Sequence, residues 1–233
     1  MTKQEIRERV WDALEDSGVA RFPFPPHGRI PNFEDSADAA VRLTDTDAWR
    51  AAETVKANPD APQLPVRRAA LRAGKTLYMA VPRLREEQCF LRLDLAEIED
   101  IDHATTVGGS AEVGIPVRPE AMPEIDLVVS GSVAVTAEGA RIGKGEGYSD
   151  LEFAVLSQFG LVDAETSTAT TVHERQIVDD TVALDDHDVP MNLVVTPERT
   201  IETGAGGKPT EIEWAALSEE KIAEIPILQR LRP

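Results

Sequence analysis

The sequence has little positive charge, a single cysteine and no long apolar run. Its 233 residues include 42 Asp and Glu against 24 Lys and Arg, which gives a formal net charge of −18. Binding to nucleic acids or to anionic lipid surfaces depends on clustered Lys and Arg side chains, so this composition argues against both as partners. The one cysteine, Cys89, excludes an intrachain disulfide and any metal site built from several cysteines.

No apolar stretch reaches the roughly 20 residues that span a bilayer. The charged residues 1–18 lack the apolar centre of a secretory signal peptide, so we expect a cytoplasmic protein with no membrane contact. Acidic residues are spread along the whole chain rather than gathered in a tail. This pattern favours a halophilic-type acidic surface, because carboxylates hold water in a salt-rich cytosol and salt screens their repulsion. An ordinary acidic protein is the plainer alternative.

Apolar residues make up 42% of the chain, which is enough for a buried core. Helical spacing of apolar residues predicts helices at 3–18, 36–43, 45–52 with Asp45 as N-cap, 62–73, 149–159 and from 218 onward. Apolar runs predict buried strands at 53–57, 76–81, 89–95, 125–135, 168–172 and 192–196. Continuous apolar strands interleaved with helices predict an α/β fold, a three-layer α/β/α domain with a mostly parallel sheet over residues 1–233. Residues 22–35 begin with a proline-rich run and are predicted to be irregular and packed on this domain.

The most informative segment is residues 139–156, GARIGKGEGYSDLEFAVL. Its glycines connect a predicted strand to a predicted helix, where they allow backbone N–H groups close to a ligand and the helix N-terminus attracts anions. Arg141 and Lys144 add positive charge, so the segment predicts a phosphate site. Its G-x-G-x-G spacing matches neither the dinucleotide fingerprint nor the P-loop. Asp150 is interpreted either as the N-cap of the helix or as a magnesium ligand.

This stretch resembles the R-L-G-x-G-x-G-Y-Y-D-R signature of the 5-formyltetrahydrofolate cyclo-ligase family, also called methenyltetrahydrofolate synthetases. The segment from Lys3 to Arg7 is similar to the family's opening K-x-x-x-R. Gly74 to Arg83 resembles its G-K-x-x-x-x-P-R segment with one additional residue, and His187 to Thr196 resembles its late H-D-x-x-x-D-x-[IV]-[IV]-T segment. The matches occur in the family's order, and the resemblance covers most of the chain.

The resemblance implies a cyclo-ligase-like fold and an enzyme of folate one-carbon metabolism that uses ATP and Mg²⁺. Such an enzyme converts 5-formyltetrahydrofolate, a reduced folate, to 5,10-methenyltetrahydrofolate with release of ADP and phosphate, and we expect a monomer or a homodimer. By the resemblance, ATP would be held by Lys3, Arg7, Arg141, Gly143, Lys144, Gly145, Glu146, Gly147 and Tyr148. By the same resemblance, Arg141, Lys144 and Tyr148 would be catalytic. The substrate would be bound by Asp60, Gln63 and Tyr148, and magnesium by Asp150 and Asp188.

Departures from the family pattern leave the identity of the substrate open. Asp60 and Gln63 stand where the family shows E-x-x-T, and Ser149 and Leu151 flank Asp150 in place of Tyr and Arg. The alternatives are a divergent nucleotide-binding member with another substrate, a non-catalytic binding or regulatory protein, and a sugar-phosphate isomerase or acyl-CoA transferase on a related sheet. Cys89 is interpreted as a core residue. His173 is interpreted as a structural histidine, with a role in the site as the alternative.

Overall fold

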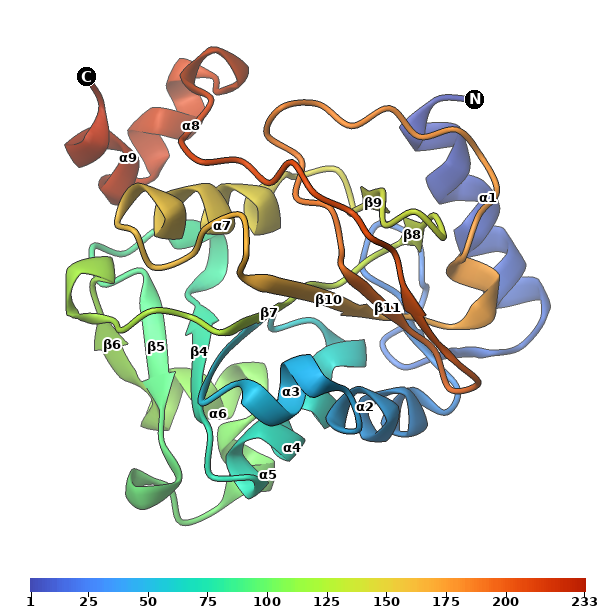
Figure 1. Ribbon diagram of the computed structural model, residues 1–233, viewed down its shortest axis with the longest axis horizontal. Helices are drawn as coiled ribbons and strands as arrows, with labels where there is room; N and C mark the ends of the chain where they lie inside the picture. The colour runs from blue at the N-terminus through green and yellow to red at the C-terminus, as the bar shows by residue number, and fades with distance from the viewer.

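The computed structural model describes residues 1–233, and its centre is an eight-stranded mixed sheet (Figure 1). The five inner strands all run parallel, because every pairing between them is parallel. The outer strands pair antiparallel with their neighbours. In spatial order the strands are β12 (Thr200–Glu202), β11 (Leu193–Val195), β10 (Ser167–Thr171), β7 (Leu127–Val129), β3 (Thr54–Ala57), β4 (Thr76–Ala80), β5 (Phe90–Leu93) and β6 (Ile115–Val117).

Helices cover both faces of this sheet, as Figure 1 shows. One face carries α2 (Ser36–Thr44), α3 (Asp47–Ala51), α4 (Leu64–Arg72), α5 (Ile101–Ala104) and α6 (Val107–Val113). The other carries α7 (Tyr148–Gln158), α8 (Glu219–Glu224) and α9 (Pro226–Leu231). Val128 belongs to the core under α7, whereas its neighbours Leu127 and Val129 belong to the core under α4. This alternation explains why the inner strands are buried on both faces, and the predicted α/β/α architecture with a mostly parallel sheet is confirmed.

A third apolar cluster lies beside the sheet, under α1 (Lys3–Asp16). It packs α1 against a two-stranded hairpin of β8 (Ala134–Val135) and β9 (Arg141–Ile142). The prediction of one strand over 125–135 is therefore wrong. The chain leaves the sheet after Val129 and turns toward β9, where the Val133 N–H donates to the carbonyl of Ile142 at 2.8 Å.

Two smaller expectations also differ from the structure. Asp45 ends α2 instead of starting the next helix, because the side chain of Thr46 accepts the Trp49 N–H and caps α3. The proline-rich segment is irregular along most of its length, but its ends pair as β1 (Ala20–Arg21) and β2 (Asn32–Phe33). Its aromatic rings do not all pack on the domain, since Phe22 is 78% exposed.

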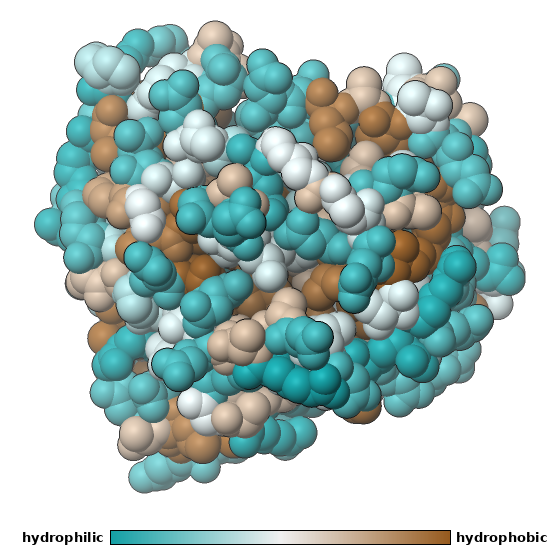
Figure 2. Space-filling model, in the orientation of Figure 1, coloured by the Kyte–Doolittle hydropathy of each residue, from teal (hydrophilic) through white to brown (hydrophobic).

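The interpretation of Cys89 as a core residue is confirmed, because the side chain is fully buried and burial raises the pKa of its thiol to about 12. His173 has a structural role, since its ring nitrogen accepts the Arg175 N–H at 3.1 Å. Figure 2 shows a mostly hydrophilic face with apolar residues in small groups. None of the helices combines the length and the apolar composition that a bilayer crossing requires.

Candidate functional site

A cavity of about 800 Å³ lies at the carboxyl ends of the central strands. Residues that follow β3, β4 and β7 line it, among them Asp60, Pro82 and Gly131. The remaining walls are formed by the proline-rich segment, the glycine loop (Gly143–Gly147) and the first turns of α7. This is where open α/β sheets bind ligands, because the loops that follow parallel strands meet at this edge.

The glycine loop presents a row of free backbone donors to the cavity. None of the N–H groups from Gly143 to Asp150 donates a hydrogen bond within the protein. Gly147 occupies the N-cap position of α7 with φ of 69°, and Gly145 has φ of 105°, so both lie in the left-handed region that favours glycine. Free N–H groups at the start of an eleven-residue helix form an anion-binding site.

Basic side chains surround this loop, but most of them already have a partner. Lys144 pairs with Glu146 at 2.7 Å, and Arg83 reaches the same carboxylate at 3.3 Å. The hydrogen bond from Lys144 is the main reason why the pKa of Glu146 is lowered. Lys221 donates to the Glu146 carbonyl at 2.8 Å and lies over the ring of Tyr148. Arg7 has no carboxylate partner and donates from Nε to the Gly143 carbonyl at 2.7 Å.

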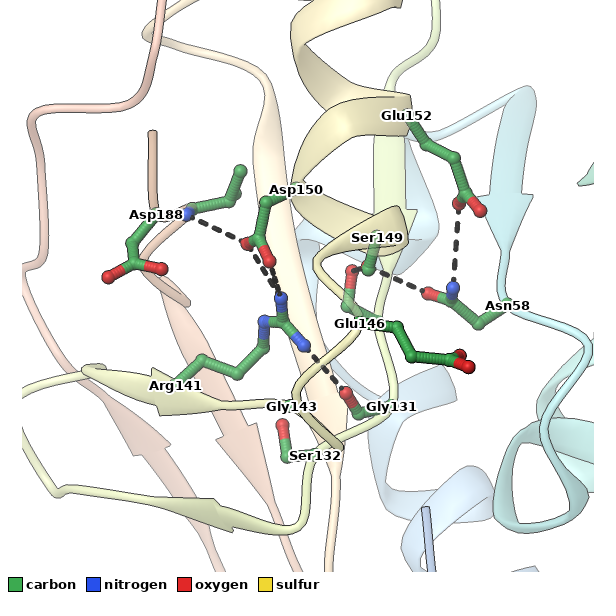
Figure 3. A network of polar contacts seen from close by, with 12 residues as sticks. Asn58, Gly131, Ser132, Arg141, Gly143, Glu146, Ser149, Asp150, Glu152 and Asp188 are labelled. Carbon is green, nitrogen blue, oxygen red and sulfur yellow. Dashed lines mark hydrogen bonds and ion pairs between the residues drawn. The ribbon is translucent and has the colours of Figure 1, made fainter. Parts of the chain in front are cut away.

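Arg141 and Asp150 form a buried ion pair next to the loop (Figure 3). One Nη group of Arg141 contacts the two carboxylate oxygens at 2.6 and 2.5 Å, and the other donates to the Gly131 carbonyl at 3.0 Å. Burial alone would lower the pKa of Arg141, but the charge and hydrogen bond of Asp150 raise it above its usual value. Asp150 also accepts the Val189 N–H at 3.1 Å, and it is not the N-cap of α7, since Gly147 holds that position.

The two carboxylates expected to bind magnesium are each neutralised by a basic side chain. Asp188 accepts from Lys3 at 2.6 Å, and the same ammonium bonds Asp185 at 3.1 Å. Asp185, His187 and Asp188 lie close enough to share an ion, but Lys3 already satisfies two of them. Mg²⁺ needs free oxygen ligands in octahedral geometry, so Asp150 and Asp188 do not fit a magnesium site in this arrangement.

Asp60 and Gln63 come together beside Gly131, where Asp60 lines the cavity and Gln63 is fully buried and does not. A Cβ atom on Gly131 would lie 3.1 Å from Asp60 Oδ2 and 2.9 Å from Gln63 Oε1, so only glycine leaves room for both groups. Burial raises the pKa of Asp60, Lys144 opposes this shift, and the negative charge of Glu152 adds to it. Gln63 donates to Thr171 at 3.2 Å, while its Oε1 is buried without a donor.

A polar network that the sequence patterns do not reveal as a group adjoins the cavity, which Asn58, Ser149 and Glu152 line. Behind this lining, Lys56 on β3 forms a buried ion pair with Glu152 on α7, and Asn58 donates to the same carboxylate oxygen at 3.5 Å. Ser149 donates to Asn58 at 3.2 Å or to Ser130 at 3.0 Å (Figure 3). A lysine within an apolar strand and a glutamate within an apolar helix face are the only local signals of this network.

Comparison with known proteins gives a consistent result along the chain. A sequence model of the 5-formyltetrahydrofolate cyclo-ligase family matches residues 1–197. The chain is 44% identical to a methenyltetrahydrofolate synthase domain-containing protein of Mus musculus, over 100% of this chain and 63% of that protein. It is 40% identical to the protein of the same name in Homo sapiens, over 100% of this chain and 62% of that protein. The chain thus spans less than two thirds of the length of these curated relatives.

A solved structure shares the fold. The NMR structure of Aquifex aeolicus 5,10-methenyltetrahydrofolate synthetase superimposes with a TM-score of 0.54 and covers 93% of this chain and 100% of that one. The sequence identity is 18%, so this likeness bears on the fold alone.

Proposed function

Because this chain belongs to the 5-formyltetrahydrofolate cyclo-ligase family, we propose that it is an ATP-dependent enzyme that converts 5-formyltetrahydrofolate to 5,10-methenyltetrahydrofolate. ADP and phosphate are the other products of this reaction. The observation that carries the proposal is the row of free N–H groups from Gly143 to Asp150, on the rim of a cavity that also contains Asp60 and Tyr148. One cavity thereby offers a place for phosphates and a place for a ring.

The glycine loop would hold the phosphates of ATP. Its N–H groups and the start of α7 favour negative charge, and Arg7 and Lys144 stand beside them. Phosphoryl transfer requires mainly that the reacting groups are positioned and that charge is stabilised. The formyl oxygen of the substrate attacks the γ-phosphate, the neighbouring amine nitrogen closes on the activated carbon, and phosphate leaves. No nucleophilic side chain is needed.

The wall that contains Asp60 would bind the pterin ring. The raised pKa of Asp60 lets its carboxyl group keep a proton, and therefore donate, at a higher pH than an ordinary aspartate. Gln63 Oε1 lies behind this wall, next to Gly131, and does not reach the cavity. A carboxyl group that can either donate or accept suits the edge of a heterocycle that carries both C=O and N–H groups. Tyr148, at the first position of α7 directly after the glycine loop, lines the same cavity.

Magnesium that arrives with ATP would shield the phosphate charge. We assign it no protein ligand, because Arg141 and Lys3 neutralise the two expected carboxylates.

One alternative has an observation in its favour. The charged Glu152 side chain in the cavity lining, paired with the buried Lys56, supports a nucleotide-dependent enzyme of the same family that acts on a different formylated or carboxylated substrate. Absorbance of methenyltetrahydrofolate, followed with and without ATP and magnesium, decides between the two. ATP binding without any product from 5-formyltetrahydrofolate would favour this alternative.

A further inference from the structure

The proline-rich segment supplies one wall of the cavity, through Phe22, Pro23, Arg29, Ile30 and Asn32. One hydrogen bond ties its backbone to α1, and another joins its two ends. Trp11 Nε1 on α1 donates to the Arg29 carbonyl at 3.0 Å, and Asn32 donates to the Phe22 carbonyl at 2.8 Å. The segment is therefore an anchored part of the cavity wall.

Arg29 stands out among the basic residues of this wall because its side chain has no partner. The guanidinium forms no ion pair and donates no hydrogen bond within the protein, and its Nε atom is buried without an acceptor. Arg21 in the same segment provides the contrast, since it pairs with Glu34 and donates to the carbonyls of Gly18 and Ala20. In a chain with a net charge of −18, an unpaired arginine that faces a cavity points to an anionic group on the ligand.

The position of the segment favours the substrate over the nucleotide as the ligand that carries this group. Ile30, next to Arg29, packs against Gly131 at the place where Asp60 and Gln63 also approach it. The segment thus adjoins the wall proposed for the ring. The glycine loop has its own cations, because Lys144 and Arg83 both form ion pairs with Glu146.

Phe22 adds a flat apolar surface to the same wall. Its ring is 78% exposed although it lines the cavity, and Phe24, two residues on, is 58% exposed. An aromatic ring at a cavity mouth provides a face on which a planar group can stack.

We propose that Arg29 binds a carboxylate of the substrate and that Phe22 contacts its planar middle part. The substrate class is then an elongated molecule with a heterocycle at one end and an acidic arm at the other. This inference rests on the proposed function and deepens it, because a reduced folate carries a benzoyl group and a glutamate in this order. A guanidinium and a carboxylate form two parallel hydrogen bonds, which gives this contact both strength and direction.

The test is calorimetric binding of two substrates to the full chain, first 5-formyltetrahydrofolate and second 5-formyltetrahydropteroate, which lacks the glutamate, with ATP affinity measured alongside. Arg29→Gln is expected to weaken binding of the first by about tenfold or more, since it removes a charge-assisted contact, and to change binding of the second by less than about twofold. Arg29→Lys should restore part of the lost affinity. Arg21→Gln is the matched control from the same segment and should leave both affinities unchanged. Phe22→Ala should lower the affinity for both ligands by the same factor.

Three outcomes would overturn the inference. Equal weakening of both ligands by Arg29→Gln would show that Arg29 does not bind the glutamate, and a loss of ATP affinity would assign it to the phosphates. Unchanged binding of 5-formyltetrahydrofolate would show that Arg29 has no role in binding. In each case the proposed function stands as long as the wild-type chain binds the folate. If the wild-type chain binds neither compound, the proposed function fails and this inference fails with it.

Discussion

Arg141 on β9 and Asp150 on α7 neutralise each other beside the glycine loop, with the two carboxylate oxygens 2.6 and 2.5 Å from one guanidinium nitrogen. The family resemblance implies ATP as the ligand of Arg141 and magnesium as the ligand of Asp150. In the structure each residue is the other's partner, so their first role is to tie the hairpin of β8 and β9 to the start of α7.

Arg141→Ala should therefore destabilise the fold, because it leaves the carboxylate of Asp150 buried without a counter-charge. The expected loss is about 3–5 kcal/mol in the free energy of unfolding, measured with urea. Asp150→Ala should cost a similar amount, and the double variant should cost less than the sum of the two. Additive effects would show that the residues do not interact.

The pair of Lys56 and Glu152 gives a second prediction about stability. Both side chains are almost fully buried, with 1% and 7% exposed. Lys56→Met alone should destabilise the protein by about 3–5 kcal/mol, since it leaves Glu152 unpaired in the core. Lys56→Met with Glu152→Met should recover most of this loss, because a buried pair can be replaced by apolar side chains at little cost. A double variant as unstable as the single one would contradict the account.

Asp60→Asn tests the ring wall through its pH dependence. Burial raises the pKa of Asp60, so the folded state holds a proton that the unfolded state releases, and the wild type loses stability as pH rises through this raised pKa. Asparagine cannot ionise, so the variant should be more stable than the wild type at pH 8, and this difference should shrink toward low pH. Urea unfolding at several pH values measures it, with the exposed Asp45→Asn as control.

The same variant should also weaken folate binding more than ATP binding, because Asp60 lies on the ring wall. Equal effects on both ligands would contradict this role.

Gly147→Ala tests the glycine loop with a small change. Gly147 has φ of 69°, so alanine should cost about 1–2 kcal/mol of stability and move the N–H groups at the start of α7. ATP affinity, measured by calorimetry, should fall more than the affinity for folate. Gly206→Ala is the matched control, since no atom lies within 4 Å of the added Cβ and its φ is not in the left-handed region. Equal ATP affinity in the two variants would place the phosphates elsewhere.

Much of the fold is visible in local patterns. The short runs of apolar and β-branched residues in β3, β4, β10 and β11 predict their strands, because each strand is buried on both faces. The strand expected over 125–135 fails because an apolar run does not show where the chain leaves the sheet. Val133 and Ala134 are as buried as Val129, but they belong to the core under α1.

The site was less predictable, because its partners are far apart in the chain. The glycine loop and α7 are adjacent in sequence, so their junction follows from spacing alone. Lys3 and Asp188 are 185 residues apart, and Lys56 and Glu152 are 96 apart, so only the tertiary fold shows that each pair forms an ion pair. The same limit applies to Arg29, whose lack of a partner becomes apparent only when all of its neighbours are in place.

The central claim is tested most directly by the ATP dependence of methenyltetrahydrofolate formation, followed by absorbance at low and at molar salt because the chain is so acidic. The account predicts product from 5-formyltetrahydrofolate only when ATP is present, with one ADP released per methenyl product. It predicts slower turnover in Gly147→Ala than in Gly206→Ala. Absence of product at every salt concentration, from a folded chain that still binds ATP, would contradict it.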